Sequence, residues 1–402
     1  MLRAARDHSL LLIESTSNQV NQFGGYTGQT PADFVKFVHA SARAMGFPWE
    51  RIVLGGDHLG PHAWRNTAAA LAMEKACDMV REYVLSGFTK IHLDASMPCE
   101  GDNLERDGRV SIDIVSARAA ELCQAAELAY RRLPHGASAP MYVIGTEVPF
   151  PGGEHSETGA LRVTRTADLK RTLDTAKKAF EACGLELAWE RVIGVVVQPG
   201  VEFGEATVIP YDSRKARLLS RFVMENWTGV FEAHSTDYQT STALRQMVKD
   251  HFAILKVGPA LTFAFREAVF ALESIEREWL HARSGISLSG VGEALERAMR
   301  ENPVHWKDHY RGDEEALRFA RKFSYSDRSR YYWPQAEVSR ALGKLVENLE
   351  LRPAPLSLLN QYLPLQAEAV RRGELVNRPK ELVRHKILGV IDQYAGACGL
   401  ED

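Results

Sequence analysis

The sequence lacks the patterns that mark several common classes of protein. Its five cysteines among 402 residues include no C-x-x-C pair, which argues against a disulfide framework and favours reduced thiols in a cytosol. The phosphate-loop pattern G-x-x-x-x-G-K-[ST] occurs nowhere in the chain. A nucleotide-dependent kinase therefore has no support in the sequence.

Long apolar runs and blocks of like charge are also absent. The longest apolar runs, such as Ile193–Val197, are far too short to cross a bilayer, and the N-terminal residues lack the layout of a signal peptide. The formal net charge is −3, so neither a nucleic acid nor an anionic membrane is expected as a partner. We expect a soluble, cytoplasmic protein.

Short apolar runs alternate along the chain with long amphipathic segments. The runs are continuous and rich in Val, Ile and Leu, which is typical of parallel strands buried on both faces. They are Leu10–Ile13, Arg51–Leu54, Lys90–Leu93, Met141–Ile144, Val192–Val197, Gly229–Phe231 and Ala253–Leu255. The helices expected between them are Pro31–Met45, with Thr30 as its N-cap, Thr67–Leu85, Ile114–Arg131, Thr166–Cys183, Ser213–Glu225 and Ser241–Asp250.

This alternation predicts an α/β fold, and polar clusters after every strand favour a TIM (β/α)8-type barrel over an open doubly wound sheet. A closed barrel has eight strands, whereas only seven are recognisable. Either Phe323–Trp333 supplies the eighth strand, or a first strand is absent from this chain. We expect the barrel over residues 1–262 and a C-terminal helical extension, packed on the barrel, over residues 263–402.

Side chains at the carboxyl ends of barrel strands converge on one pocket. His58, Glu147 and His234 offer two imidazoles and one carboxylate, an open ligand set suited to a divalent metal such as Zn²⁺. Such a metal would polarise a sugar carbonyl, with Asp57 or Glu154 as the catalytic base. The alternative is that these polar groups pair with one another and with the backbone.

Other polar residues at the strand ends are candidates for binding a sugar phosphate. They are Asn18, Asp94, Gln198, Asp237, Lys256 and Gly258. The backbone N–H groups of Gly258-Pro259-Ala260, at the start of a helix, could bind a phosphate, or the glycine could serve only a tight turn. The segment Asp327–Arg330 could clamp a phosphate or pack in an interface, and we slightly favour packing.

Several long polar motifs resemble those of one family. They are Ser17–Gly28, Gly55–Pro61, Lys90–Asp94, Ile144–Pro149, Val197–Phe203, Phe231–Thr240, Leu255–Thr262, Ser324–Pro334 and Gln361–Leu365. Over essentially the whole chain, the sequence resembles the GatZ/KbaZ-type subunit of class II D-tagatose-1,6-bisphosphate aldolase. The resemblance implies a non-catalytic partner that stabilises the catalytic aldolase subunit in D-tagatose 6-phosphate catabolism. Other relatives are D-tagatose 6-phosphate 4-epimerases, and we favour the subunit function over this alternative.

The family is also similar to the catalytic class II aldolases, and this similarity implies roles for single residues. Asp57 matches their proton-transferring Asp, and His58 and His234 match zinc-binding histidines. Gln198 stands where those enzymes have a further zinc-binding His, and Gly258 stands where they have an Asn that holds the substrate. These two departures speak against aldolase activity. Relatives usually carry an additional N-terminal strand, so we expect the missing strand to be the first.

Overall fold

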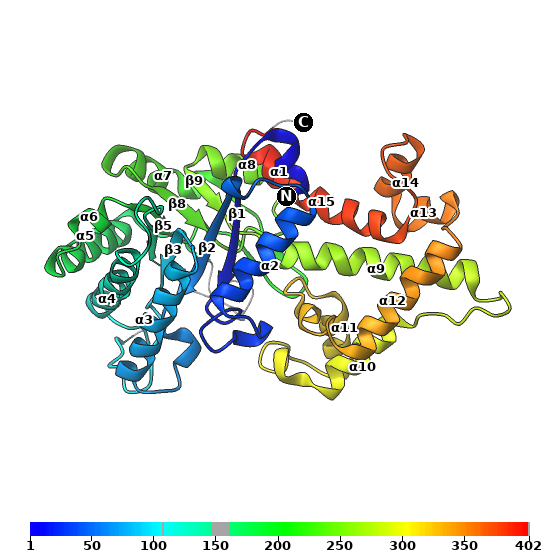
Figure 1. The fold of residues 1–402 in the computed structure, drawn as a ribbon, viewed down its shortest axis with the longest axis horizontal. Helices are drawn as coiled ribbons and strands as arrows, with labels where there is room; N and C mark the ends of the chain where they lie inside the picture. Colours follow the sequence, from blue (N-terminus) through cyan, green and yellow to red (C-terminus); the bar gives the residue numbers. More distant parts are fainter. Residues whose placement is uncertain (107, 146–160, 401–402) are drawn as a thin grey trace.

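A curled parallel sheet with helices on its outer side forms one half of the molecule (Figure 1). The computed structural model describes residues 1–106, 108–145 and 161–400. Within them, seven strands follow the order β1-β2-β3-β4-β5-β8-β9. Their bounds are Leu11–Thr16, Ile52–Leu59, Lys90–Leu93, Met141–Gly145, Val192–Val196, Val230–Ala233 and Phe252–Leu255. Each of the seven predicted strands is therefore confirmed.

The predicted helices are confirmed too, and they cover the outer face of the sheet (Figure 1). They are α2 (Pro31–Ala44), α3 (Ala69–Leu85), α4 (Ile112–Tyr130), α5 (Thr166–Ala182), α7 (Ser213–Asn226) and α8 (Ser241–Lys249). Short additions are α1 (Leu2–Asp7), α6 (Glu186–Trp189) and the hairpin of β6 (Glu202–Phe203) and β7 (Val208–Ile209). The main core lies between sheet and helices and includes Tyr83, Ile91 and Phe231.

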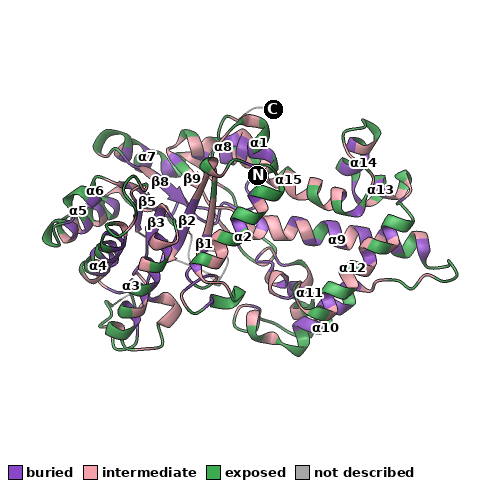
Figure 2. Cartoon of the chain, in the orientation of Figure 1, coloured by how far each residue is buried: buried purple, intermediate pink, exposed green. Residues whose placement is uncertain are grey.

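The sheet is open, and no pairing between described strands joins its edges β1 and β9. Much of β1 is only partly buried (Figure 2), and Leu12 is 38% exposed. The proposed eighth strand, Phe323–Trp333, was wrong. It runs from the end of α11 (Glu314–Phe323) through a 3-10 turn, Arg328–Tyr331. Its aromatic residues pack between helices, where Tyr332 is fully buried. That the first strand is the absent one stays a prediction.

A helical extension forms the other half of the molecule and begins directly after β9 (Figure 1). It comprises α9 (Pro259–Leu280), α10 (Val291–Glu301), α11, α12 (Ala336–Leu351), α13 (Leu356–Tyr362), α14 (Pro364–Arg371) and α15 (Pro379–Ala397). Helix α15 returns along α9 to pack on α8 and α1, where Arg3 lies 3.2 Å from Asp392. The predicted boundary at residue 262 falls inside α9. None of the described helices has both the length and the apolarity that a membrane crossing requires.

The start of α2 is fixed by a capping box. The Thr30 hydroxyl oxygen accepts from Asp33 N, and the Asp33 carboxylate accepts from Thr30 N, both at 3.3 Å. We expect Thr30→Ala to lower the free energy of unfolding by about 1 kcal/mol, whereas Thr30→Ser keeps the hydroxyl and loses less. Chemical denaturation measures both variants, and equal losses would contradict the capping role.

Candidate functional site

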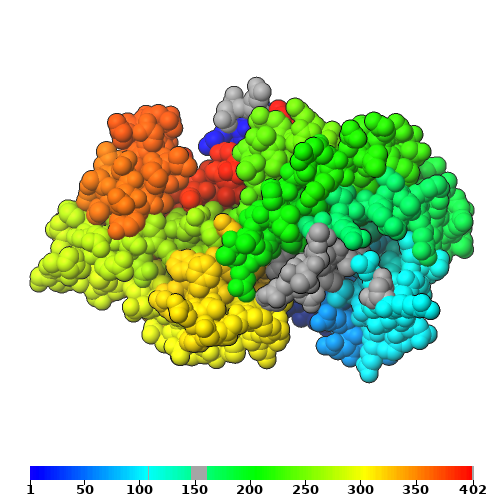
Figure 3. Space-filling view, turned by 180° about the vertical axis from the view of Figure 1, so that it is seen from behind, coloured from blue at the N-terminus to red at the C-terminus, as the bar shows by residue number. Residues whose placement is uncertain are grey.

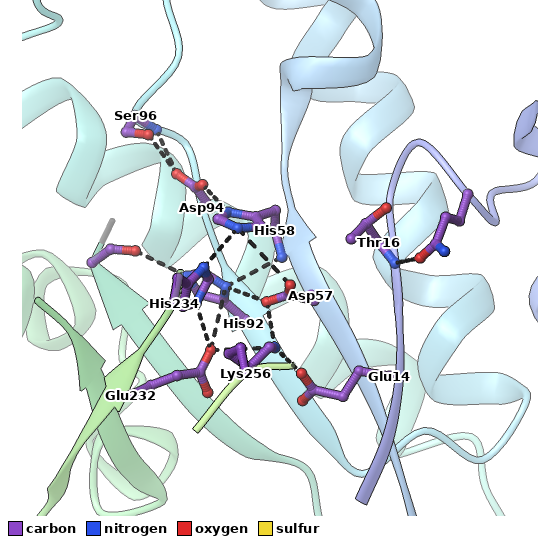
Figure 4. A network of polar contacts seen from close by, with 12 residues as sticks. Glu14, Thr16, Asp57, His58, His92, Asp94, Ser96, Glu232, His234 and Lys256 are labelled. Atoms are coloured by element: carbon purple, nitrogen blue, oxygen red, sulfur yellow. Dashed lines mark hydrogen bonds and ion pairs between the residues drawn. The ribbon is translucent and has the colours of Figure 1, made fainter. Parts of the chain in front are cut away.

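Nine charged or ionisable side chains meet inside the curl of the sheet, and Figure 4 labels all of them except Lys90. This group, called the central cluster below, consists of Glu14, Asp57, His58, Lys90, His92, Asp94, Glu232, His234 and Lys256. The side chains come from β1, β2, β3 and β8 and from the residues that follow β3, β8 and β9. Alternate residues of a curled strand point to its interior, so residues distant in sequence converge there.

The deepest part of the central cluster is a network of ion pairs. Lys90 Nζ lies 2.7 Å from Glu14 Oε1 and 2.5 Å from Glu232 Oε2. Lys256 Nζ pairs with Glu14 and lies 2.8 Å from Asp57 Oδ1. Two ammonium groups are thus shared among three carboxylates, which offsets the cost of removing each charge from water.

The pKa values of Glu232 and Lys256 in this network are both lowered, for different reasons. Burial alone would raise the pKa of Glu232, but the charge of Lys90 and the hydrogen bond from His234 hold it at about 2. Burial lowers the pKa of Lys256 well below its usual value. Glu232 therefore remains a carboxylate over the whole neutral range.

Two histidines face each other above the ion pairs. Nε2 of His58 lies 3.1 Å from Nδ1 of His234. The other nitrogen of each ring contacts a carboxylate: His58 Nδ1 lies 2.6 Å from Asp94 Oδ2, and His234 Nε2 lies 3.0 Å from Glu232 Oε1. Ser96 donates to Asp94 at 2.6 Å and orients that carboxylate.

A third histidine, His92, lies between the ion-pair network and the pair of facing histidines, His58 and His234. Its Nδ1 lies 3.0 Å from Asp57 Oδ1, and its Nε2 lies 2.9 Å from the carbonyl oxygen of Gly145. The backbone N–H of His58 also donates to this Nδ1, at 3.2 Å. The ring of His92 is therefore fixed on both sides, between β2 and β4.

An irregularity in β2 aims the His58 side chain. His58 has a φ of 49°, a left-handed conformation that non-glycine residues seldom adopt, and the pairing of β2 with β3 shifts at this point. The strand then passes close to β3, where a Cβ at Gly60 would lie 1.6 Å from the carbonyl oxygen of Asp94. The motif Gly55–Gly60 thus places an imidazole where a regular strand would not.

The donor set of the central cluster fits a divalent metal. Asp57, His58, His92 and His234 each place a ligand atom within 4.8 Å of the others. Two nitrogen ligands of a tetrahedral zinc, each at about 2.1 Å from the ion, lie about 3.4 Å apart, close to the 3.1 Å between His58 Nε2 and His234 Nδ1. A carboxylate holds the far nitrogen of each ring, as second-sphere partners of metal-bound histidines do.

Comparison with known proteins identifies the family. Over residues 1–399 the chain matches the family described as "D-tagatose-1,6-bisphosphate aldolase subunit GatZ/KbaZ-like". The chain belongs to this family. It is similar to the crystal structure of "a probable tagatose 6 phosphate kinase" from Sinorhizobium meliloti, with 44% identity, a TM-score of 0.89, and coverage of 99% of this chain and 96% of that one.

Two aldolase structures resemble this member of the GatZ/KbaZ-like family more weakly. The fructose-bisphosphate aldolase of Campylobacter jejuni is 15% identical over 89% of this chain and 84% of that chain, with a TM-score of 0.43. The YdjI aldolase of Escherichia coli is 11% identical over 87% and 83%, with a TM-score of 0.34. At these scores the likeness supports no conclusion about this chain.

The structure brings five of the predicted site residues together in the central cluster. They are Asp57, His58, Asp94, His234 and Lys256. Gln198 is buried at the end of β5, but its Oε1 accepts from the N–H groups of Gly200 and Val201 and shapes its own loop. Asn18 is exposed beyond β1. Glu147 and Glu154 lie outside the described residues.

Asp237 and Gly258, predicted to bind substrate, contact each other. Asp237 Oδ1 accepts from the N–H groups of Gly258 and Ala260, at 2.9 and 2.8 Å. The amides of Gly258 and Ala260, which were predicted to bind a phosphate, are therefore hydrogen-bonded to the Asp237 carboxylate. This carboxylate caps the N-terminus of α9.

Sequence reasoning missed Lys90 and His92, which lie in the middle of the network. Both belong to a four-residue strand, Lys90–Leu93, which was interpreted as a buried run and as part of a family motif but not as a source of site residues. A signal was present, because a lysine and a histidine two positions apart in a buried strand point to the same face. Buried polar groups at one face of a strand require partners, and these partners are the carboxylates of the cluster.

The pKa of His58 offers a test of this geometry in the metal-free chain. Burial alone would lower it, but the charge of Asp57 and the hydrogen bond to Asp94 raise it from 6.5 to about 9. Because the folded-state pKa is raised, the stabilisation is complete below pH 6.5 and is lost as the pH rises through 9. We expect Asp94→Asn to move the pKa of His58 back toward 6.5 in an NMR titration.

The matched control is Asp174→Asn, which removes an exposed carboxylate on α5. It should leave the titration of His58 unchanged. An Asp94→Asn protein whose His58 titrates as in the unaltered chain would show that the contact with Asp94 does not set this pKa.

Proposed function

We propose that this chain is a metal-dependent epimerase that inverts C4 of a ketose 6-phosphate, with D-tagatose 6-phosphate as the first substrate to test. The central cluster is the observation that carries the proposal. Six of its nine ionisable groups are buried, and such groups contribute less to stability than apolar side chains of the same volume would. A protein that serves only to stabilise a partner has no need of such a cluster.

The substrate class is supported by the family and by the relatives. The description of the family names a subunit of D-tagatose-1,6-bisphosphate aldolase. The name of one relative contains tagatose 6-phosphate. The kinase in that relative's name receives no support from this chain, whose sequence has no phosphate loop.

His58 and His234 would hold the metal, with Glu147 as the third ligand predicted from the sequence. A divalent metal there would supply Lewis acidity toward the C2 carbonyl of the ketose. Asp57, between His92 and Lys256, would accept the proton of the C4 hydroxyl.

Loss of that proton opens the C3–C4 bond and gives an aldehyde and an enediolate. When the aldehyde presents its other face, the same bond re-forms, and Asp57 returns the proton to the C4 oxygen. No atom is gained or lost, and the product is the C4 epimer. Lys256, 2.8 Å from Asp57 Oδ1, would compensate the charge of the Asp57 carboxylate before it accepts the proton and after it returns the proton.

The test is incubation of the full chain with D-tagatose 6-phosphate and Zn²⁺, Co²⁺, Mn²⁺ or Mg²⁺ in turn. We expect D-fructose 6-phosphate to form, and Asp57→Asn to slow its formation by about 10²–10⁴-fold because the general base is lost. Lys177→Gln, an exposed change on α5, should leave the rate unchanged. Metal-loaded protein that forms no product with any of these ions would refute the proposal.

A second function is favoured by the family match itself. In it, the chain binds the catalytic class II tagatose-bisphosphate aldolase subunit and stabilises it without turnover of its own. We expect the half-life of that aldolase to lengthen when this protein is added, and to lengthen equally with Asp57→Asn, because stabilisation does not need the base. An unchanged half-life would rule out this function.

A further inference from the structure

The turn between α11 and α12 lies over the carboxyl ends of the strands. The hydroxyl of Tyr238, in the loop after β8, donates to the carbonyl oxygen of Tyr325 at 2.6 Å. Tyr325 N donates to the carbonyl oxygen of Glu205, in the β6–β7 hairpin, at 2.9 Å. The ring of Tyr26, in the loop after β1, lies 5.1 Å from the ring of Tyr331. From behind, the yellow surface of the extension adjoins the green surface around this hairpin (Figure 3).

Two arginines on this turn are held in place by neutral groups alone. Arg330 donates to the carbonyl oxygen of Asp327 at 3.1 Å and to the hydroxyl of Tyr331 at 2.9 Å, and its guanidinium stands 4.5 Å over the Tyr331 ring. Arg328 donates to the carbonyl oxygen of His305 at 2.9 Å. These contacts orient both guanidinium groups but do not neutralise them.

Neither arginine forms an ion pair within the described part of the chain. No described carboxylate lies within ion-pair distance of either, because the Asp327 carboxylate pairs with Arg266 at 2.8 Å. Nε of Arg328 is buried and has no hydrogen-bond partner among these residues. Burial and the two arginine charges lower the pKa of His305 and of His309, which favours neutral imidazoles beside the arginines.

A pair of partly buried positive charges without an ion-pair partner is unfavourable. A guanidinium can form two parallel hydrogen bonds to phosphate oxygens. We propose that Arg328 and Arg330 form a phosphate subsite at the mouth of the curled sheet, which binds the phosphate group of the ketose phosphate. The inference that the ligand is a ketose phosphate rests on the proposed function. The inference that the subsite binds a phosphate group rests on the two arginines alone. The turn that carries the arginines is bonded to Tyr238, four residues after His234 in the loop beyond β8, so the subsite lies at the same end of the sheet as the central cluster.

Calorimetric titration of the full chain with inorganic phosphate tests the subsite without turnover. We expect binding that Arg328→Gln and Arg330→Gln each weaken at least about tenfold, and that Arg330→Lys weakens less because the charge remains. Arg340→Gln, an exposed change on α12, should bind as the unaltered chain does. Absence of phosphate binding by the unaltered chain, or unchanged binding by both glutamine variants, would overturn the proposal. Unchanged circular dichroism and melting temperature would show that the variants are folded.

A second titration distinguishes a subsite for the sugar phosphate from a subsite for free phosphate. D-tagatose 6-phosphate should bind more tightly than both D-tagatose and inorganic phosphate, and Arg330→Gln should abolish the advantage over D-tagatose. Equal binding of the phosphorylated and unphosphorylated sugars would overturn the assignment to the substrate. Because these are binding measurements, a chain that binds D-tagatose 6-phosphate through Arg330 but shows no epimerase turnover would refute the proposed function and leave the subsite intact.

Discussion

The ion pairs of one buried lysine set the geometry on which the candidate site depends. Lys90 is 2% exposed and joins Glu14 of β1 to Glu232 of β8 at 2.7 and 2.5 Å. These strands stand first and sixth in the sheet, so in a flat sheet they would be about 24 Å apart, five spacings of about 4.8 Å. Both carboxylates can reach one ammonium group only because the sheet curls. The same curl brings the carboxyl ends of the strands around one point.

The carboxylates that compensate the lysines also hold the imidazoles. Glu232 pairs with Lys90 and contacts His234, and Asp57 pairs with Lys256 and contacts His92. The carboxylates that balance the buried charges of the lysines therefore also orient the histidines of the candidate site. The charge balance that makes the interior of the curled sheet stable also fixes which nitrogen of each histidine faces the centre.

The helical extension brings one of its turns beside the loops at the strand ends. Arg266 on α9 and Asp327 on the turn before α12 form a buried ion pair, with side chains 2% and 0% exposed. A broken pair would leave an uncompensated buried charge, so this contact fixes the turn strongly. The turn then lies over the strand ends, where Tyr325 and Tyr331 contact the loops of the sheet. The long helix that begins directly after β9 thus helps to hold a segment distant in sequence against the loops at the strand ends.

The sequence by itself determined the strands, the helices between them and the residues at the strand ends. Continuous apolar runs mark buried parallel strands, and Asp57, His58 and His234 follow such runs, so their convergence could be predicted. Only the tertiary structure decided which polar groups pair. Lys90 and His92 lie within an apolar run, and their partners come from strands far away in the sequence. The Gly258 amide bonds to Asp237, and Phe323–Trp333 packs between helices, because the partner of an amide or a ring depends on what the folded chain brings beside it, which local sequence does not encode.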